Sequence, residues 1–365
     1  MNLHERAALA AIHAIKGVGN RSMWNLKEEF GSFQAVLNAD RERLMRFKLP
    51  DEAVKAILDL PKSGDLELQL KRIDQQAVNL ITFEDEDYPQ LLRNISNPPY
   101  VLYTKGDIKA TNHLCLAIVG SRTATPYGKM AARKFSLELA QNNAAVVSGM
   151  ARGIDTEAHQ GALEGSGVTI AVLGSGMDVI YPPENQRLFH KICENGLVIT
   201  ELPLGTAPEP GNFPARNRII SGLSRGVIVV EAMEKSGALI TADFALEQGR
   251  DVFAVPGPIN SKTSTGTNNL IKQGAKLITC VEDVLEEYFF HNNENEKLNL
   301  QQQKLLMLDK NEQMIIECIE SQPVHFDEIL AATGFEIGLL STVLLKLEFE
   351  GIIKSLPGNS YVKIF

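Results

Sequence analysis

The sequence predicts an α/β protein whose main part is an extended Rossmann-like, doubly wound and mostly parallel sheet. A small all-α domain is expected before it and a winged helix after it. Three observations predict this fold class. Within the expected sheet domain at 66–290, strands alternate with helices from about residue 110 onward, and most of the strands are continuous apolar runs, as in parallel strands buried on both faces. Residues 1–65 have the pattern of short helices, and residues 309–365 that of three helices followed by a hairpin.

The first 65 residues contain a tight turn, Ile15-Lys16-Gly17-Val18-Gly19, between two expected helices. This turn resembles a helix-hairpin-helix, in which glycine N–H groups contact a phosphate. A glycine turn that only joins two packed helices is an equally good interpretation. Two expected strands follow, Asn79 to Thr82 and Tyr100 to Tyr103, with Pro98-Pro99 as a break between them.

The middle section continues with seven short apolar runs that alternate with helical stretches. In a doubly wound sheet, ligands bind beyond the carboxyl ends of the strands, so the loops that follow these runs are the candidate site. The predicted strands are Leu114 to Val119, Ala144 to Val147, Thr169 to Leu173, Leu197 to Thr200, Val227 to Val230, Val252 to Val255 and Lys276 to Thr279.

The loop after the first of these strands, Gly120-Ser121-Arg122, leads into a helical stretch that begins near Tyr127. A strand, a glycine turn and a helix form a phosphate cradle. Between Cys115 and Phe135 the chain has four basic residues and no acidic one, so this corner is locally cationic. The loop predicts binding of an anion.

The loop after the next strand runs from Ser148 to Asp155 and contains Gly149 and Gly153. Glycines allow the backbone to approach a ligand closely. Asp155 is expected to cap a helix that starts at Thr156, which is a structural role. This second loop is therefore predicted to meet the same ligand as the first.

The stretch Asn212 to Ser224 places Arg216, Asn217 and Arg218 near the start of a short helix, where Pro214 fits the first turn. The positive end of the helix and the two arginines predict an anionic partner. The alternative is that the arginines form surface ion pairs, which contribute little. Phe213 precedes this turn, and either stacks on a ligand or belongs to the core.

Other loops that follow strands also contain polar groups, which again predicts a ligand site at the carboxyl edge of the sheet. Glu201 and Glu231 are carboxylates at strand ends, and hydrogen-bonded structural roles are expected for both, because neither lies in a recognised arrangement with a base. Two other loops supply glycines beside polar side chains. These are Gly174-Ser175-Gly176 and Lys235-Ser236-Gly237.

The polar run at residues 291–308 is predicted to be a linker to the winged helix. Residues 309–365 contain nine acidic and four basic residues, a net charge of −5. The expected recognition helix offers Glu336, Ser341, Thr342 and Lys346, which is a poor set for binding phosphates. The winged helix is therefore predicted to bind protein.

The composition of the chain argues against several classes of protein and kinds of site. The 365 residues are 44% hydrophobic and 22% charged, with a net charge of −9 and a pI near 5.4, which disfavours a protein that coats duplex DNA through bulk charge. The four cysteines are scattered, so neither a disulfide framework nor a zinc site is expected, and no metal or cofactor is predicted. No apolar run reaches membrane length and the N-terminus lacks a signal pattern, so a cytoplasmic protein without a membrane partner is expected.

The middle section resembles the DNA-processing protein A family, also called DprA or Smf. The matching segments follow one another in the family's order and span most of the sheet domain. They are A-I-V-G-S-R-T-A-T-P-Y-G at 117–128, S-G-M-A-R-G-I-D at 148–155, G-S-G-M-D-V-I-Y-P-P-E-N at 174–185, T-E-L-P-L-G-T at 200–206, F-P-A-R-N-R-I-I-S-G-L-S at 213–224, K-S-G-A-L-I-T-A at 235–242 and G-R-D-V-F-A-V-P-G at 249–257.

The resemblance implies a single-stranded DNA-binding protein of natural transformation that protects incoming DNA and helps to load the RecA recombinase onto it. It implies no chemical reaction and no catalytic residue. A homodimer is also expected, because one sheet domain spans few nucleotides and a dimer would extend the track. It also implies a sterile-alpha-motif-like or helix-hairpin-helix-like unit over residues 1–65. The residues implied to bind DNA are Ser121, Arg122, Gly149, Gly153, Phe213, Arg216, Asn217, Arg218, Lys235, Ser236 and Gly237.

Two enzyme classes are the alternatives. A nicotinamide-dependent oxidoreductase would need G-x-G-x-x-G after the first strand, where this chain has Gly120-Ser121-Arg122. The stronger alternative is a phosphoribohydrolase of nucleoside monophosphates, similar to the lysine decarboxylase-like Rossmann family. Its G-G-x-G-T-x-x-E signature would fall near Gly237 to Phe244, where Thr241 is present but Phe244 replaces the catalytic glutamate.

Overall fold

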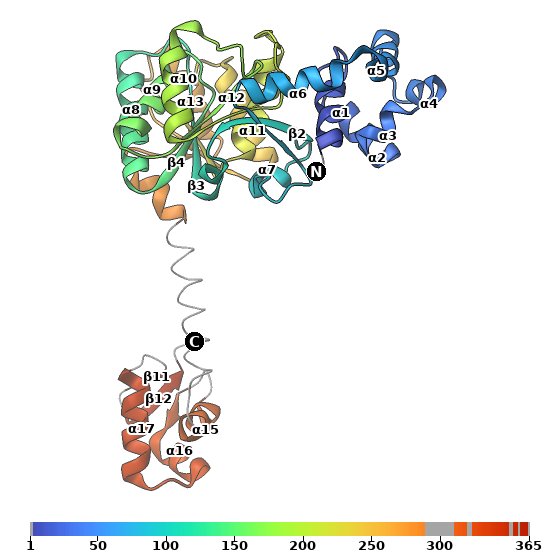
Figure 1. Cartoon of the computed structure of the whole chain (residues 1–365). Coiled ribbons are helices and arrows are strands. Elements are labelled where there is room, and N and C mark those ends of the chain that lie inside the picture. Colours follow the sequence, from blue (N-terminus) through green and yellow to red (C-terminus); the bar gives the residue numbers. More distant parts are fainter. Residues whose placement is uncertain (1–2, 289–309, 320–322, 350–352, 357, 364–365) are drawn as a thin grey trace. The chain divides into compact units, whose positions relative to one another are not determined.

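A computed structural model describes residues 3–288, 310–319, 323–349, 353–356 and 358–363. It divides the chain into two compact units, Met1–Val284 and Leu285–Phe365 (Figure 1). The predicted linker at 291–308 lies outside the described residues. The finer division into a helical domain at 1–65, a sheet domain at 66–290 and a winged helix at 309–365 stays a prediction.

The first unit begins with six helices. Gly17 lies in the turn after the first helix with φ 94°, and a Cβ there would come within 2.9 Å of the Pro50 ring. Asn20, the first residue of the next helix, donates to the Pro98 carbonyl at 3.0 Å, so this helix end packs against the protein itself. The helices are α1 (Leu3–His13), α2 (Asn20–Phe30), α3 (Phe33–Leu37), α4 (Arg41–Met45), α5 (Asp51–Ser63) and α6 (Asp65–Gln75).

A sheet in the order β1-β2-β6-β5-β4-β3-β7-β8-β9 forms the centre of the unit. The seven strands β6-β5-β4-β3-β7-β8-β9 are parallel to their neighbours, while β2 is antiparallel to both β1 and β6. The mostly parallel sheet is therefore confirmed. The strands are β1 (Asn79–Thr82), β2 (Val101–Gly106), β3 (Leu114–Val119), β4 (Ala144–Ser148), β5 (Thr169–Val172), β6 (Leu197–Thr200), β7 (Gly226–Val229), β8 (Asp251–Ala254) and β9 (Lys276–Leu277).

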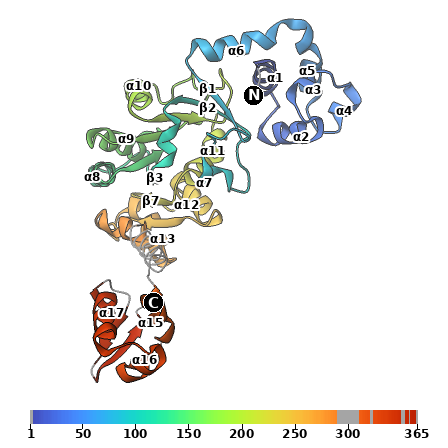
Figure 2. The ribbon, with the colours of Figure 1, turned by 60° about the horizontal axis from the view of Figure 1, so that its bottom comes forward.

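Helices cover both faces, with α8, α9 and α10 on one side and α11 and α12 on the other (Figure 2). Alternate residues of the central strands enter different cores: Ile170 and Val172 of β5 pack with α11 and α12, whereas Ala171 packs with α10. Burial on both faces explains why these strands are continuous apolar runs. The connecting helices include α7 (Gln90–Arg93), α8 (Pro126–Gln141), α9 (Ile154–Glu164), α10 (Gln186–Asn195), α11 (Asn212–Gly222), α12 (Gly237–Glu247) and α13 (Thr265–Lys272).

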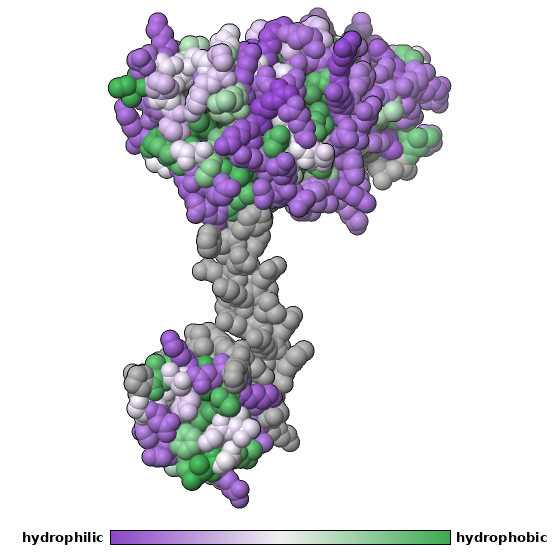
Figure 3. Space-filling view, turned by 90° about the vertical axis from the view of Figure 1, so that its left-hand side faces the viewer, coloured by the Kyte–Doolittle hydropathy of each residue, from purple (hydrophilic) through white to green (hydrophobic). Residues whose placement is uncertain are grey.

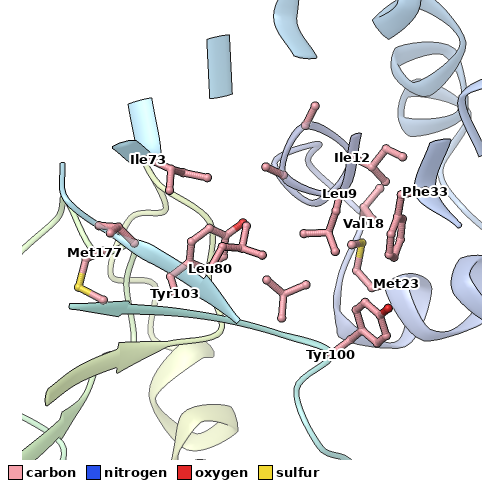
Figure 4. Close-up of a cluster of buried hydrophobic side chains, with 14 of the residues drawn as sticks. Leu9, Ile12, Val18, Met23, Phe33, Ile73, Leu80, Tyr100, Tyr103 and Met177 are labelled. Atoms are coloured by element: carbon pink, nitrogen blue, oxygen red, sulfur yellow. The ribbon is translucent and has the colours of Figure 1, made fainter. Parts of the chain in front are cut away.

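The N-terminal helices share a hydrophobic core with the sheet (Figure 4). Leu9 and Phe33 from the helices lie in the same cluster as Tyr100 and Tyr103. His13 Nδ1 lies 3.0 Å from the Tyr103 hydroxyl, and burial lowers the pKa of His13 to about 4, which keeps the ring neutral. The helices and the sheet are therefore one folded unit.

The second unit has a winged-helix fold, as predicted. Its sheet has the order β10-β12-β11, and its core contains Ile315, Ile329, Leu340 and Leu347. The two-residue strand β10 is too short to give a sequence pattern and was not predicted. The elements are α15 (Lys310–Cys318), β10 (Val324–His325), α16 (Phe326–Thr333), α17 (Ile337–Phe349), β11 (Ile353–Leu356) and β12 (Ser360–Lys363).

Apolar side chains reach the surface of this unit (Figure 3). Ile337 is 65% exposed and Leu345 55% exposed, both on α17. Of the helices that the structure describes, none is alone long and apolar enough to cross a membrane, although α16 and α17 meet that criterion together with a bend of 114° between them.

Candidate nucleic-acid interface

A cavity of about 540 Å³ opens at the carboxyl ends of β3 and β7, between their loops and the start of α11. Its lining combines cationic side chains, hydroxyl groups and two aromatic rings. Eight of the predicted DNA-binding residues line it: Ser121, Arg122, Phe213, Arg216, Asn217, Lys235, Ser236 and Gly237.

Hydrogen bonds of Ser121 and the close approach of Gly153 fix the loop after β3. The Ser121 N–H donates to the Glu231 carbonyl at 2.8 Å, and the Ser121 hydroxyl accepts from the Thr123 N–H at 3.2 Å. Gly153 has φ 77°, and a Cβ at this residue would lie 2.3 Å from the Ser121 carbonyl oxygen. Gly153 therefore supports the loop from behind the cavity instead of contacting its contents, because only glycine fits this approach.

Arg122 is exposed at the mouth of the cavity, with its guanidinium carbon 5.1 Å from the centre of the Phe213 ring. Phe213 is half-buried and packs on Gly174, where a Cβ would come within 2.8 Å of the ring. The Tyr181 ring lies 5.6 Å from that of Phe213. Tyr181 also lines the cavity but was not predicted, because it lies nine residues beyond the end of β5, farther along its loop than the Gly174-Ser175-Gly176 turn.

Arg216 is buried in the cavity wall, with 4% of its surface exposed. Its Nη1 donates to the Gly149 carbonyl at 2.7 Å and also to the Val172 carbonyl. A Cβ on Gly149 would lie 2.6 Å from Nη2, so this glycine makes room for the guanidinium. Burial lowers the pKa of Arg216 to about 10, with Asp155 opposing that shift, and the side chain remains charged at neutral pH.

Arg218 lies outside the cavity lining. It forms a buried ion pair with Glu201, and only 8% of its surface is exposed. The sequence predicts Arg218 in the DNA groove or in a surface ion pair, whereas the structure shows an ion pair that is largely shielded from solvent. Burial raises the pKa of Glu201, and Arg218 opposes that shift. The structural role predicted for Glu201 is confirmed.

Glu231 also has the predicted structural role. Its carboxylate accepts from the Thr125 N–H at 2.9 Å and from the Thr125 hydroxyl at 2.6 Å. Thr125 is the N-cap of α8, and its hydroxyl accepts from the Gly128 N–H. The buried Glu231 carboxylate thus fixes the start of α8 directly behind the Ser121 loop.

The prediction that Asp155 caps its helix is wrong. The helix begins at Ile154, with Gly153 as the N-cap, so Asp155 is its second residue. The positive φ of Gly153 turns the chain into the helix two residues earlier than predicted. Asp155 instead accepts from the N–H groups of Gly149 at 3.2 Å and Ala151 at 3.3 Å.

Asn217 joins the two helices that meet at the cavity. Its Nδ2 donates to the Gly237 carbonyl at 3.1 Å, at the start of α12. Ser236 is the N-cap of α12, with its hydroxyl 3.4 Å from the Ala238 N–H, and Lys235 beside it is exposed. This helix start therefore presents a lysine and N–H groups to the cavity.

The cavity has the chemistry of a phosphate site beside a ring-stacking surface. Arg122, Arg216 and Lys235 supply positive charge, while Phe213 and Tyr181 supply rings. Among the described residues, no group of three His, Cys, Asp or Glu side chains could hold a metal ion. Thr241 lines the cavity, but Phe244, which replaces the hydrolase glutamate, is not part of the lining.

Both units of the chain match known protein families. Residues 79–289 match the family described as DNA recombination-mediator protein A, and residues 301–359 match the DprA winged helix domain. Protein Smf of Escherichia coli (strain K12) is 41% identical over 314 residues, covering 84% of this chain and 83% of that protein. DNA processing protein DprA of Streptococcus pneumoniae is 47% identical over 206 residues, covering 56% and 73%.

Two solved structures are similar. The X-ray structure of DprA from Streptococcus pneumoniae has a TM-score of 0.68 and 36% identity, covering 79% of this chain and 98% of that one. A structure of DNA processing protein A from Helicobacter pylori, described by its single-stranded DNA binding mode, has a TM-score of 0.54 and 33% identity, covering 59% and 96%.

Proposed function

The chain belongs to the DNA recombination-mediator protein A family, also called DprA or Smf, and on this premise we propose that its cavity binds single-stranded DNA. The observation that carries the proposal is the Arg122 guanidinium over the Phe213 ring at the cavity mouth. A phosphate on the arginine would bring its nucleotide's base within reach of the ring. The related Helicobacter pylori protein binds single-stranded DNA, which supports the same ligand here.

The positive charge that attracts DNA has to come from the cavity itself. The whole chain carries a net charge of −9, so long-range electrostatics disfavour nucleic acid. Three cations line the cavity, and one of them, Arg216, is buried where solvent screens it little. Stacking on Phe213 adds a contribution that tolerates any base sequence.

The proposal extends to the cellular role. The protein would receive incoming single strands during natural transformation, protect them and help to load the RecA recombinase onto them, without catalysing a reaction. A homodimer would lengthen the DNA track, because one cavity spans few nucleotides. Since strands and recombinase meet inside the cell, the proposal includes a cytoplasmic location.

Arg122→Ala is expected to weaken binding of single-stranded DNA and to lower the slope of log affinity against log salt by roughly 0.7, the contribution of one phosphate contact. Fluorescence anisotropy with a labelled oligonucleotide at several salt concentrations measures both quantities. Arg187→Ala, which removes an exposed arginine of α10 outside the cavity lining, is the matched control and should change neither. Unchanged affinity and slope in a folded Arg122→Ala variant would refute the proposed site.

Deleting residues 309–365 is expected to leave single-stranded DNA binding within about twofold, because the removed segment has a net charge of −5 and the cavity lies wholly in the first unit. Circular dichroism and gel filtration first establish that the shortened chain is folded and self-associates as the full chain does. Loss of binding in that folded protein would contradict the prediction that the winged helix binds protein.

A further inference from the structure

Asp155 places a negative charge in a cavity proposed to bind an anion. Among the described residues that line this cavity, Asp155 is the one with a carboxylate, and the lining also contains Arg122, Arg216 and Lys235. Only 6% of its surface is exposed. A buried carboxylate here would repel a phosphate, so its presence needs a reason beyond electrostatics.

The contacts of Asp155 indicate that its role is to position the loop after β4. Its Oδ2 accepts from the N–H groups of Gly149 and Ala151, and so fixes the backbone of the loop after β4. The carbonyl of Gly149 in turn accepts from Arg216 Nη1. Asn185 holds the same loop through the Met150 carbonyl at 3.0 Å. Asp155 therefore helps to fix the position of Arg216, because both side chains bind the backbone of Gly149.

The groups around Asp155 determine how it responds to a ligand. Arg216 on α11 and Arg122 after β3 favour its ionised form, as do the two loop N–H groups. His159, one turn further along α9, is buried, and burial lowers the pKa of His159 to about 3, so it stays neutral. Burial is the largest influence on Asp155 itself and raises its pKa to about 6.

A phosphate in the cavity would add a second negative charge close to this carboxylate and engage the same arginines. Two anions sharing one partly enclosed site favour protonation of the weaker acid. The phosphodiester is much the stronger acid, so the proton goes to Asp155. Protonation removes the repulsion, and one carboxyl oxygen can still accept from the loop.

We infer that Asp155 is a positioning residue for DNA binding: it orients the loop after β4 and, through it, Arg216, and it takes up a proton when a phosphate occupies the cavity. This inference rests on the proposed function. It predicts that the affinity for single-stranded DNA increases as pH falls through the range in which Asp155 titrates, because protons bind with the ligand.

The test compares the wild type with Asp155→Asn, using an oligothymidylate, whose bases and phosphates do not titrate between about pH 5.5 and 7.5. Wild-type affinity should rise several-fold as the pH falls across this range, approaching the roughly tenfold limit set by a rise of one pKa unit, beyond any change in Asp155→Asn. The matched control is Asp178→Asn, which changes an exposed carboxylate that accepts from the Gly205 N–H outside the cavity lining. It should keep the wild-type pH profile.

Two further measurements separate positioning from mere folding. Asp155→Ala, which loses the acceptor, should bind several-fold more weakly than Asp155→Asn while its melting temperature confirms folding. Calorimetry of oligothymidylate binding by the wild type at about pH 6.5, in buffers of different ionisation enthalpy, should show net proton uptake. Identical pH profiles for the wild type and Asp155→Asn, or binding without proton uptake, would overturn the inference while leaving DNA binding at the cavity intact. Failure of the wild type to bind the oligonucleotide would refute the proposed function as well.

Discussion

Replacing Phe213 by alanine is expected to weaken single-stranded DNA binding by about 5- to 150-fold, because stacking of one base on an aromatic ring contributes roughly 1 to 3 kcal/mol. The salt dependence of binding should barely change, since no phosphate contact is lost. The half-buried ring lies between Gly174, Tyr181 and Arg122, with one side open to the cavity. Affinity at several salt concentrations measures both effects.

Thermal unfolding of the same variant separates stacking from packing. A core phenylalanine replaced by alanine would cost about 3 to 5 kcal/mol, and Phe189→Ala on α10, where the ring is 2% exposed, provides that comparison. Phe213→Ala should lose clearly less stability than Phe189→Ala. A large loss of stability with affinity preserved in the folded fraction would assign Phe213 to the core.

Replacing Arg218 by alanine is expected to lower the free energy of unfolding by about 3 to 5 kcal/mol, because the Glu201 carboxylate, whose side chain is only 14% exposed, would lose its partner. Urea titration followed by circular dichroism measures the change. The double variant Arg218→Met with Glu201→Leu should recover most of the loss, since well-packed apolar side chains replace both charges.

The double variant also tests the predicted DNA contact of Arg218. Its ion pair lies outside the cavity lining, so we expect the folded double variant to bind single-stranded DNA with wild-type affinity. A loss of affinity comparable to that of Arg122→Ala would show that Arg218 does contribute to DNA binding. A loss of stability no larger than that of an exposed arginine would show that the buried pair is unimportant.

The sheet could be predicted from the sequence because its central strands are buried on both faces and are therefore continuous apolar runs. Each of the seven strands predicted between residues 114 and 279 lies within two residues of its observed position. Parallel strands bring their carboxyl ends to one edge, and this rule, together with the family resemblance, predicted that Ser121, Phe213 and Lys235 lie together. The cavity lining confirms that they do.

The direction of individual side chains could not be predicted in the same way. Arg216 and Arg218 are two residues apart on a helix, so their side chains point roughly 200° apart, and only one can face the cavity. Which one does so depends on Glu201 after β6 and on the Gly149 carbonyl after β4, and neither is a local signal. The same holds for Asp155, whose acceptor role depends on how the loop before it folds back.

The core that joins the N-terminal helices to the sheet constrains how this sequence can evolve. His13 and Tyr103 are both buried and meet beside that core, so we expect a change in the size or polarity of one to require a matching change in the other. Exchange of the first six helices for those of a distant relative would leave Tyr100 and Tyr103 against an unmatched surface. The winged helix encloses its own core, so recombination can replace it as a separate module without disturbing the cavity.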